Sequence, residues 1–235
     1  MLVLSEKQVE SLIDINELIS TLEKAHIQYS TGKAVMPVRL VVPLPQIQGR
    51  ITSMPGFLNE DKALGMKVVT YFQDNPERNL PAILGTIMLF SADTGKLIAV
   101  MDGSYVTAIR TACASAMATK KLANGETPVL GVLGAGVQAR AHILALTHVR
   151  KIERIKIYSP SGASAAGIKQ DLEQDTKIAI EVATNAETAV RGADLLVTGS
   201  TARSRSSKVH GSKPACTSTP SVRIDRTTAK SMARR

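Results

Sequence analysis

The residues with the clearest chemical meaning form a glycine-rich turn in the middle of the chain. An apolar run, residues 129–133, leads into Gly134-Ala135-Gly136-Val137-Gln138-Ala139 and then into a segment with helical spacing. A strand, a Gly-x-Gly-x-x-Ala turn and a helix start are typical of a dinucleotide-binding unit, in which a helix N-terminus holds a pyrophosphate. Gly134 would permit the turn, Gly136 the approach of the phosphate, and Ala139 close packing of helix on strand. The alternative interpretation is an ordinary tight turn between strand and helix.

Three basic side chains occur among apolar neighbours. Lys67 lies inside an apolar run that we predict to be a strand, Arg39 stands between Val38 and Leu40, and Arg110 lies in an alanine-rich helical segment. Burying a cation without a partner is costly, so each needs a structural carboxylate or an anionic ligand. Taken singly, each is best explained as a solvated charge or a structural ion pair. Three of them before a nucleotide-binding unit favour a pocket for a carboxylate.

The second strand of the nucleotide-binding unit, residues 154–158, leaves the coenzyme undecided. Folds that prefer NAD place an acid at the end of this strand, where it binds the ribose hydroxyls. Here the strand is followed by Ser159-Pro160-Ser161, which offers neither that acid nor an arginine for a 2′-phosphate. The sequence therefore predicts NAD(P)(H) without choosing between NAD and NADP. We interpret Asp194, further along, as an edge or turn residue rather than a catalytic acid.

These residues require two architectures around them. Helices are predicted after a capping box at Ser5 and at about 16–31, followed by strands at 38–42, 50–54, 64–72, 83–90 and 97–101. These strands form a mostly antiparallel sheet, and a helix at 103–123 leads into alternating strands and helices up to residue 198. The predicted fold class is α/β, with a mixed α+β domain (1–125), an incomplete Rossmann-type domain (126–200) and a tail (201–235).

The positive charge of the chain is concentrated in the tail. Nine of the 29 Lys and Arg residues, but only one of the 20 acids, lie in residues 203–235. This segment has no Leu, Phe or Tyr and no helical or strand periodicity, so it cannot bury enough surface to offset its ordering entropy. We predict that the tail is disordered or translated out of frame. The alternative is a natural tail that binds nucleic acid or membrane. We do not favour it, because the main body of the chain is nearly neutral and indicates no such partner.

The remaining composition indicates a cytoplasmic protein. No apolar run approaches the roughly 20 residues that span a bilayer, and the N-terminus lacks the features of a signal peptide. The two cysteines, Cys113 and Cys216, argue against a disulfide framework. No metal site is predicted.

Several short segments together resemble the ornithine cyclodeaminase/μ-crystallin family. They are Met36-Pro37-Val38-Arg39, Met54-Pro55-Gly56, Gly65-Met66-Lys67-Val68-Val69, Ala99-Val100-Met101-Asp102-Gly103, Arg110-Thr111-Ala112 with Ser115-Ala116, and the glycine-rich turn. The resemblance implies homodimeric enzymes that use NAD(P)(H) to move a hydride at the α-carbon of an amino or imino acid. It includes cyclodeaminases, alanine dehydrogenases and ketimine or Δ1-pyrroline-2-carboxylate reductases. The first domain would then serve substrate binding and dimerisation.

The resemblance also assigns roles to individual residues. Arg39, Lys67 and Arg110 would bind the substrate carboxylate, and Lys67 would act in catalysis by polarising the imine. The cofactor would contact Thr111, Gly134, Gly136, Val137, Gln138, Ala139, Ser159, Ser161 and Thr198. Thr52 stands where cyclodeaminases of the family carry a glutamate that meets the side-chain amine of ornithine. We therefore favour a ketimine-type reductase over an ornithine cyclodeaminase.

The resemblance ends at about Gly199. Family members continue with further Rossmann strands, a catalytic aspartate and a return of the chain to the dimerisation domain, none of which follows here. Two functions therefore remain open at this point. One is NAD(P)-dependent reduction of a small imino acid, and the other is a truncated, inactive remnant of such an enzyme.

Overall fold

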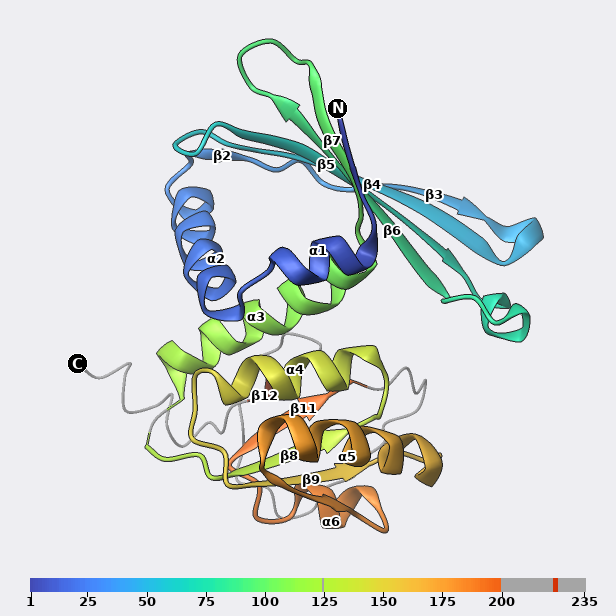
Figure 1. The fold of residues 1–235 in the computed structure, drawn as a ribbon, viewed down its shortest axis with the longest axis vertical. Helices are drawn as coiled ribbons and strands as arrows, with labels where there is room; N and C mark the ends of the chain where they lie inside the picture. The colour runs from blue at the N-terminus through green and yellow to red at the C-terminus, as the bar shows by residue number, and fades with distance from the viewer. Residues whose placement is uncertain (124, 200–221, 224–235) are drawn as a thin grey trace. The chain divides into compact units, whose positions relative to one another are not determined.

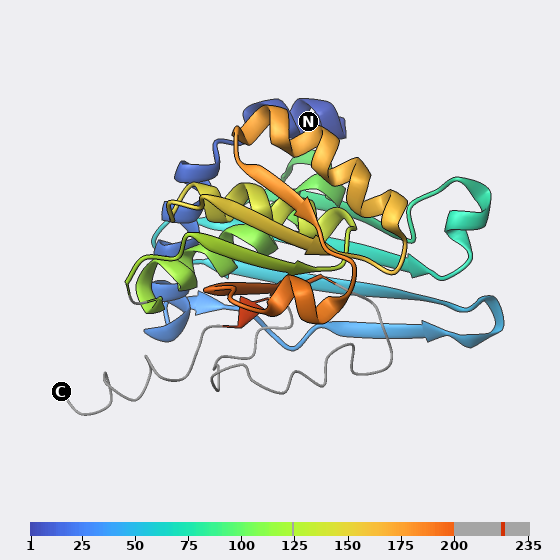
Figure 2. The same cartoon turned by 90° about the horizontal axis from the view of Figure 1, so that it is seen from below.

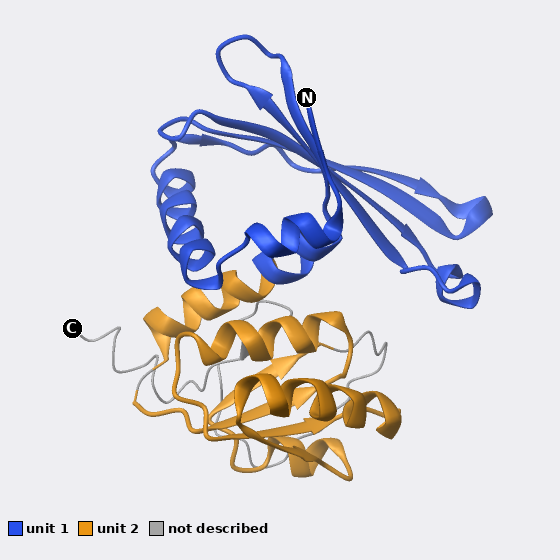
Figure 3. Ribbon diagram, viewed as in Figure 1, with its two compact units in different colours: residues 1–110 blue, residues 111–235 orange. Residues whose placement is uncertain are grey.

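The computed structural model describes residues 1–123, 125–199 and 222–223, and the chain divides into two compact units (Figure 1, Figure 3). The units are residues 1–110 and 111–235, so the division falls inside the helix α3 (Ser104–Leu122). The first domain predicted from the sequence ends after this helix instead, at residue 125. The prediction for the tail concerns residues outside the described part, apart from Val222 and Arg223, which form the short strand β12.

The first unit is built on a seven-stranded sheet. Its strands are β1 (Leu2–Leu4), β2 (Ala34–Val35), β3 (Leu40–Leu44), β4 (Gly49–Leu58), β5 (Ala63–Phe72), β6 (Ile83–Ser91) and β7 (Leu97–Asp102). They lie in the order β1-β7-β6-β5-β4-β2, with β3 also paired to β4, and only the β1–β7 pair is parallel. The predicted mostly antiparallel sheet is therefore confirmed, whereas the short strands β1 and β2 were not predicted.

Two helices lie on one side of this sheet. α1 (Glu6–Leu12) contacts β7, and α2 (Ile15–Ser30) contacts β2 and β4 (Figure 1). The predicted capping box is present, because Gln8 Oε1 accepts a hydrogen bond from Ser5 N–H at 2.9 Å. Two short 3₁₀ helices, η1 (Pro45–Ile47) and η2 (Asn75–Arg78), lie between strands. The helices thus cover one face of the sheet.

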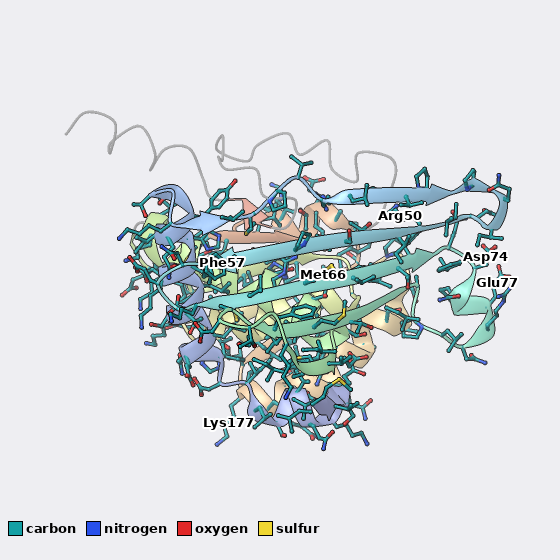
Figure 4. The ribbon with its side chains drawn as sticks, turned by 90° about the horizontal axis from the view of Figure 1, so that it is seen from above. Arg50, Phe57, Met66, Asp74, Glu77 and Lys177 are labelled. Atoms are coloured by element: carbon teal, nitrogen blue, oxygen red, sulfur yellow. The ribbon has the colours of Figure 1, made fainter. Side chains whose placement is uncertain are left out.

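The other face of the sheet is apolar and open. Directly paired residues share a face, and Leu40 pairs with Ser53, which pairs with Val68. The same face carries exposed aliphatic side chains: Leu40 (64%), Val42 (42%), Ile51 (37%) and Leu84 (38%). Figure 4 looks onto this face, where Phe57 and Met66 are in view. A contiguous apolar surface of this kind on a sheet is typical of an interaction surface.

The second unit contains a five-stranded sheet in the order β10-β9-β8-β11-β12. The four strands β8 (Val129–Leu133), β9 (Arg154–Tyr158), β10 (Ala179–Val182) and β11 (Leu195–Thr198) are parallel, and β12 (Val222–Arg223) is antiparallel to β11. Figure 2 shows them side by side in the green-yellow to red part of the ribbon. The helices α4 (Val137–Thr147), α5 (Gly162–Thr176) and α6 (Ala186–Val190) alternate with the strands. This arrangement is Rossmann-like and confirms the α/β class.

The parallel strands are buried, as their continuous apolar runs predict. Val132, Ile157 and Val197 have no exposed surface, and neither have Ile143 and Leu146 of the covering helix α4. None of the helices in the described ranges is long and apolar enough to cross a membrane.

Gly131 in β8 lets the end of α6 and the turn after it approach the sheet. A Cβ atom at this position would lie 2.7 Å from the carbonyl oxygen of Ala189 and 3.0 Å from Cβ of Ala193. By contrast, a Cβ atom at Gly167, inside α5, would meet nothing within 4 Å. The two glycines therefore differ in what a methyl group would do.

We predict that Gly131→Ala lowers the free energy of unfolding by about 2 kcal/mol, because the added methyl group overpacks against fixed backbone. Gly167→Ala is the matched control and should raise it by about 0.5–1 kcal/mol, since alanine is the better helix former. Denaturant-induced unfolding followed by circular dichroism measures both. Equal effects of the two substitutions would contradict the packing described for β8.

Candidate functional site

Arg39 and Lys67 are brought into one row by the register of the first sheet. Lys67 in β5 pairs with Met54 of β4 on one side and with Ile87 of β6 on the other. β3 begins at Leu40, which pairs with Ser53, so Arg39 directly precedes β3 next to the position of Met54. Residues paired in this way point to the same face of a sheet. The structure therefore places Arg39 and Lys67 on the face opposite to the open apolar one.

Arg110 is positioned by the way in which α3 begins. Gly103 N–H donates to Gly85 O at 2.8 Å, and a Cβ atom on either glycine would lie 3.0 Å from backbone atoms of the other. Asp102 Oδ1 then accepts a hydrogen bond from Ser104 N–H at 2.7 Å. The close backbone approach fixes the start of α3 on β6, and Arg110 follows about two turns later.

Electrostatics shows that the three cations form one cluster. The pKa of Lys67 is lowered from 10.5 to about 8, first by desolvation and then by the positive charges of Arg110 and Arg39. Desolvation and the charge of Arg39 also lower the pKa of Arg110. Lys67 is half-buried, whereas Arg39 and Arg110 are exposed. We call Arg39, Lys67 and Arg110 the cation cluster.

The cation cluster lacks a counter-ion in the part of the chain that the structure describes. Among the residues that the structure describes, no carboxylate forms a hydrogen bond or an ion pair with any of the three side chains. Thr52, on the same face and 8% exposed, offers a hydroxyl rather than a carboxylate. Like charges held together in this way repel one another. The arrangement suits an anionic ligand with a planar carboxylate, which two guanidinium groups and an ammonium group can bind.

The second group of predicted residues gathers at one edge of the parallel sheet. Leu133, the last residue of β8, pairs with Tyr158 at the end of β9 and with Thr198 at the end of β11. Gly134, Ser159 and Gly199 therefore leave the sheet side by side. Ligands of open α/β sheets bind outside the carboxyl ends of the strands, which is this edge.

The glycine-rich turn has the geometry that a pyrophosphate requires. Gly134 has φ of +105°, in the region that favours glycine, and an added Cβ atom at Gly136 would meet nothing within 4 Å. The first helical bond of α4 runs from Arg140 N–H to Gly136 O, so the N–H groups of residues 137–139 have no partner inside the helix. Ala139 is fully buried, as its role in close packing requires. These residues fit a dinucleotide.

The remaining predicted cofactor contacts are placed less directly. Ser161 is the N-cap of α5, where its hydroxyl accepts from Ser164 N–H, and Ser159 follows β9 at the sheet edge. Thr198 ends β11 at the same edge, and Thr111 lies in α3. Their roles toward a cofactor remain predictions. Asp194 is structural, because its Oδ2 accepts from Val129 N–H at 3.0 Å, and the described residues contain no cluster of metal ligands.

The second unit contains a buried polar pair, His142 and Ser115, for which no role was predicted from the sequence. His142 of α4 is fully buried, with Nδ1 2.7 Å from Gln138 O and Nε2 3.1 Å from the hydroxyl of Ser115 in α3. The only sequence signal is a polar residue between Ala141 and Ile143 on an otherwise apolar helix.

We predict that Arg110→Met raises the pKa of Lys67 from about 8 toward 10.5, because it removes a positive charge that disfavours the protonated amine. The pH dependence of Lys67 acylation, followed by mass spectrometry, measures this shift. Arg78→Met, on the exposed helix η2, is the control and should leave the profile unchanged.

The lowered pKa also fixes the sign of a stability effect. The pKa of Lys67 is lower in the folded chain than in the unfolded chain. Its contribution to the free energy of unfolding is therefore fully present above pH 10.5 and is lost as the pH falls through about 8. For the acylation experiment, the contradicting result is a pH dependence of Lys67 acylation that is the same in Arg110→Met and in the parent chain, because the three cations would then not form a cluster.

Comparison with known proteins adds a family to this geometry. The sequence matches the ornithine cyclodeaminase/mu-crystallin family over residues 1–211. It is 33% identical over 198 residues to a Delta(1)-pyrroline-2-carboxylate reductase of Bacillus cereus (84% of this chain, 61% of that protein). It is 34% identical over 185 residues to the ketimine reductase mu-crystallin of Macropus fuliginosus (77% of this chain, 58% of that protein).

A solved structure shows the same fold. It is that of Thermococcus litoralis Delta(1)-pyrroline-2-carboxylate reductase in complex with NADH and L-proline. It superposes with a TM-score of 0.84 at 35% identity, covering 86% of this chain and 63% of that one. The chain therefore spans less than two thirds of the length of the relatives that it matches.

Proposed function

The chain belongs to the ornithine cyclodeaminase/mu-crystallin family, and from this we propose that it is an NAD(P)-dependent reductase of a small α-imino acid. The proposed substrate is a ketimine of the Δ1-pyrroline-2-carboxylate type, and the product is the corresponding amino acid. The observation that carries the proposal is the cation cluster, which lacks a counter-ion among the described residues and fits the carboxylate of such a substrate. Relatives that act on Δ1-pyrroline-2-carboxylate and on ketimines support it.

The cation cluster suits the charge changes of this reaction. Reduction of an imine adds a hydride to carbon and a proton to nitrogen, and a nicotinamide cofactor supplies the hydride when bound. Arg39 and Arg110 would hold the carboxylate, since guanidinium groups bind carboxylates in a bidentate way. The Lys67 ammonium would contact the carboxylate as well and would hydrogen-bond to the imine nitrogen. Its pKa of about 8 is close to neutral pH, which suits a group that holds and moves a proton.

The edge of the parallel sheet would hold the cofactor. The N–H groups of the glycine-rich turn would bind the pyrophosphate, and Ser159 and Ser161 would contact the adenosine ribose. Neither serine repels a 2′-phosphate as a carboxylate would, and neither binds it as an arginine would. We therefore propose that NADH and NADPH are both accepted. The NADH complex of the Thermococcus litoralis protein supports a nicotinamide cofactor.

Ornithine cyclodeaminase is the alternative activity. It requires recognition of the second amine of ornithine, for which a carboxylate is the natural partner. Thr52 lies on the same face as Lys67 and two residues from its partner Met54, but it carries no charge. The uncharged Thr52 beside the cation cluster therefore favours an imino acid without a side-chain amine as the substrate.

We also propose that the chain forms a homodimer in the cytoplasm. The open apolar face of the first sheet supports the dimer, because aliphatic side chains such as Leu40 and Val42 are exposed there. The low cysteine content supports a reducing compartment. Sedimentation velocity at micromolar concentration measures the oligomeric state.

We predict that the chain reduces Δ1-pyrroline-2-carboxylate to proline with both NADH and NADPH, with values of kcat/KM that differ by less than about tenfold. Lys67→Met should lower kcat/KM at least about a hundredfold, because it removes a carboxylate contact and the proton donor. Lys96→Met, in the exposed β6–β7 hairpin, is the matched control and should leave kcat/KM unchanged.

Oxidation of the coenzyme at 340 nm measures the reduction, and release of ammonia from ornithine measures the alternative. Ammonia release without reduction of the imino acid would replace this proposal by the cyclodeaminase. Full activity of Lys67→Met would contradict the role of the cation cluster.

A further inference from the structure

The hydrogen bond between His142 and Ser115, both buried, joins α4, which follows the glycine-rich turn, to α3. We propose that His142 is a positioning residue for the dinucleotide: through Ser115 it anchors the first turn of α4 to α3 and so orients the Ala139 N–H toward the pyrophosphate. The inference rests on the proposed binding of a nicotinamide dinucleotide. It adds a residue that does not itself touch the cofactor.

The hydrogen bonds of His142 define its tautomer. A carbonyl oxygen only accepts, so Nδ1, at 2.7 Å from Gln138 O, carries the hydrogen and donates it. Nε2 is then an acceptor, and the hydroxyl of Ser115 donates to it at 3.1 Å. Both ring nitrogens are satisfied by a neutral imidazole. Desolvation lowers the pKa of His142, in the direction that keeps the ring neutral, and the Gln138 hydrogen bond opposes part of this effect.

The bond to Gln138 acts on the binding turn through the peptide plane. The carbonyl of Gln138 and the N–H of Ala139 belong to one planar peptide unit and point in opposite directions. Fixing the carbonyl therefore fixes the direction of the Ala139 N–H. This N–H precedes the first helical donor, Arg140, and is one of the groups that a helix N-terminus offers to an anion.

Ser115 is a firm anchor for this contact because α3 is held at several points within the second unit. Thr119 Oγ1 donates to the carbonyl of Ser115 at 2.9 Å. The guanidinium of Arg150 donates to the carbonyls of Thr119 at 2.9 Å and Ala123 at 2.6 Å, so it caps the C-terminal end of the helix. The anchor thus rests on a helix end that is itself fixed.

Packing alone does not require a histidine here. The neighbouring buried positions of α4, Ala141, Ile143, Ala145 and Leu146, are apolar. A buried polar pair repays its desolvation only when its hydrogen bonds are made, and it then specifies one relative position of the two helices. An apolar residue would fill the volume of His142 but would leave the Gln138 carbonyl with only the backbone hydrogen bond of the helix and would lose the link to Ser115.

The test compares NADH binding by substituted full-length chains, with the quenching or enhancement of NADH fluorescence as the readout. His142→Leu should raise the Kd for NADH about tenfold. His142→Asn keeps a donor near the position of Nδ1 but has no acceptor near the position of Nε2, so it should recover only part of the affinity. Ser115→Ala should weaken binding, and its effect should vanish when His142 is already Leu, because both substitutions break the same link.

Ile143→Val is the matched control for a general loss of stability, because Ile143 is the fully buried neighbour of His142 on α4. It should lower the unfolding midpoint and leave the Kd for NADH unchanged. The inference is overturned if the Kd follows the loss of stability equally in Ile143→Val and His142→Leu, or if His142→Leu binds NADH like the parent chain. Failure of the parent chain to bind NADH would overturn the proposed cofactor as well, so the two failures are distinguishable.

Discussion

The first unit holds together three positive charges that lack a counter-ion within residues 1–123, 125–199 and 222–223, and this is the constraint on which its candidate site depends. Each of the elements around them contributes to that placement. The register of β3, β4 and β5 aligns Arg39 with Lys67, and the contact between Gly85 and Gly103 fixes the helix that carries Arg110. Burial, and then the charges of Arg110 and Arg39, lower the pKa of Lys67, and an anionic ligand would relieve the repulsion among the three cations. We propose that this repulsion costs stability and leaves the site ready to bind a carboxylate.

The candidate anion site of the second unit is made of uncharged backbone groups. It consists of backbone N–H groups at the start of α4, so binding depends on the direction of peptide units rather than on charged side chains. The buried link from Ser115 through His142 to Gln138 supplies that direction from within the core. The two proposed sites would therefore bind anions in different ways, by a cluster of cations in one unit and by an oriented helix end in the other.

Local patterns are sufficient to predict most of the elements and to single out the residues of the candidate site, but not the geometry of that site. The glycine-rich turn and the strand–helix alternation are local signals, and the structure confirms the elements predicted from them. β1 and β2 were missed because strands of three and two residues carry no periodicity. The proximity of Arg39 to Lys67 depends on strand register, and the partners of His142 depend on how two helices pack, so neither can be read from neighbouring residues. The tail lies outside the described residues, apart from β12.

The central claim is that the cation cluster binds the carboxylate of a ligand. Calorimetry of L-proline binding tests this claim most directly. A bound carboxylate should raise the pKa of Lys67 above about 8, so binding at pH 8 should take up protons from the buffer. Titrations in buffers of different ionisation enthalpy measure this uptake. The account predicts proton uptake by the parent chain and none by Lys67→Met. Binding with no proton uptake at pH 8, or equal uptake in both chains, would contradict it.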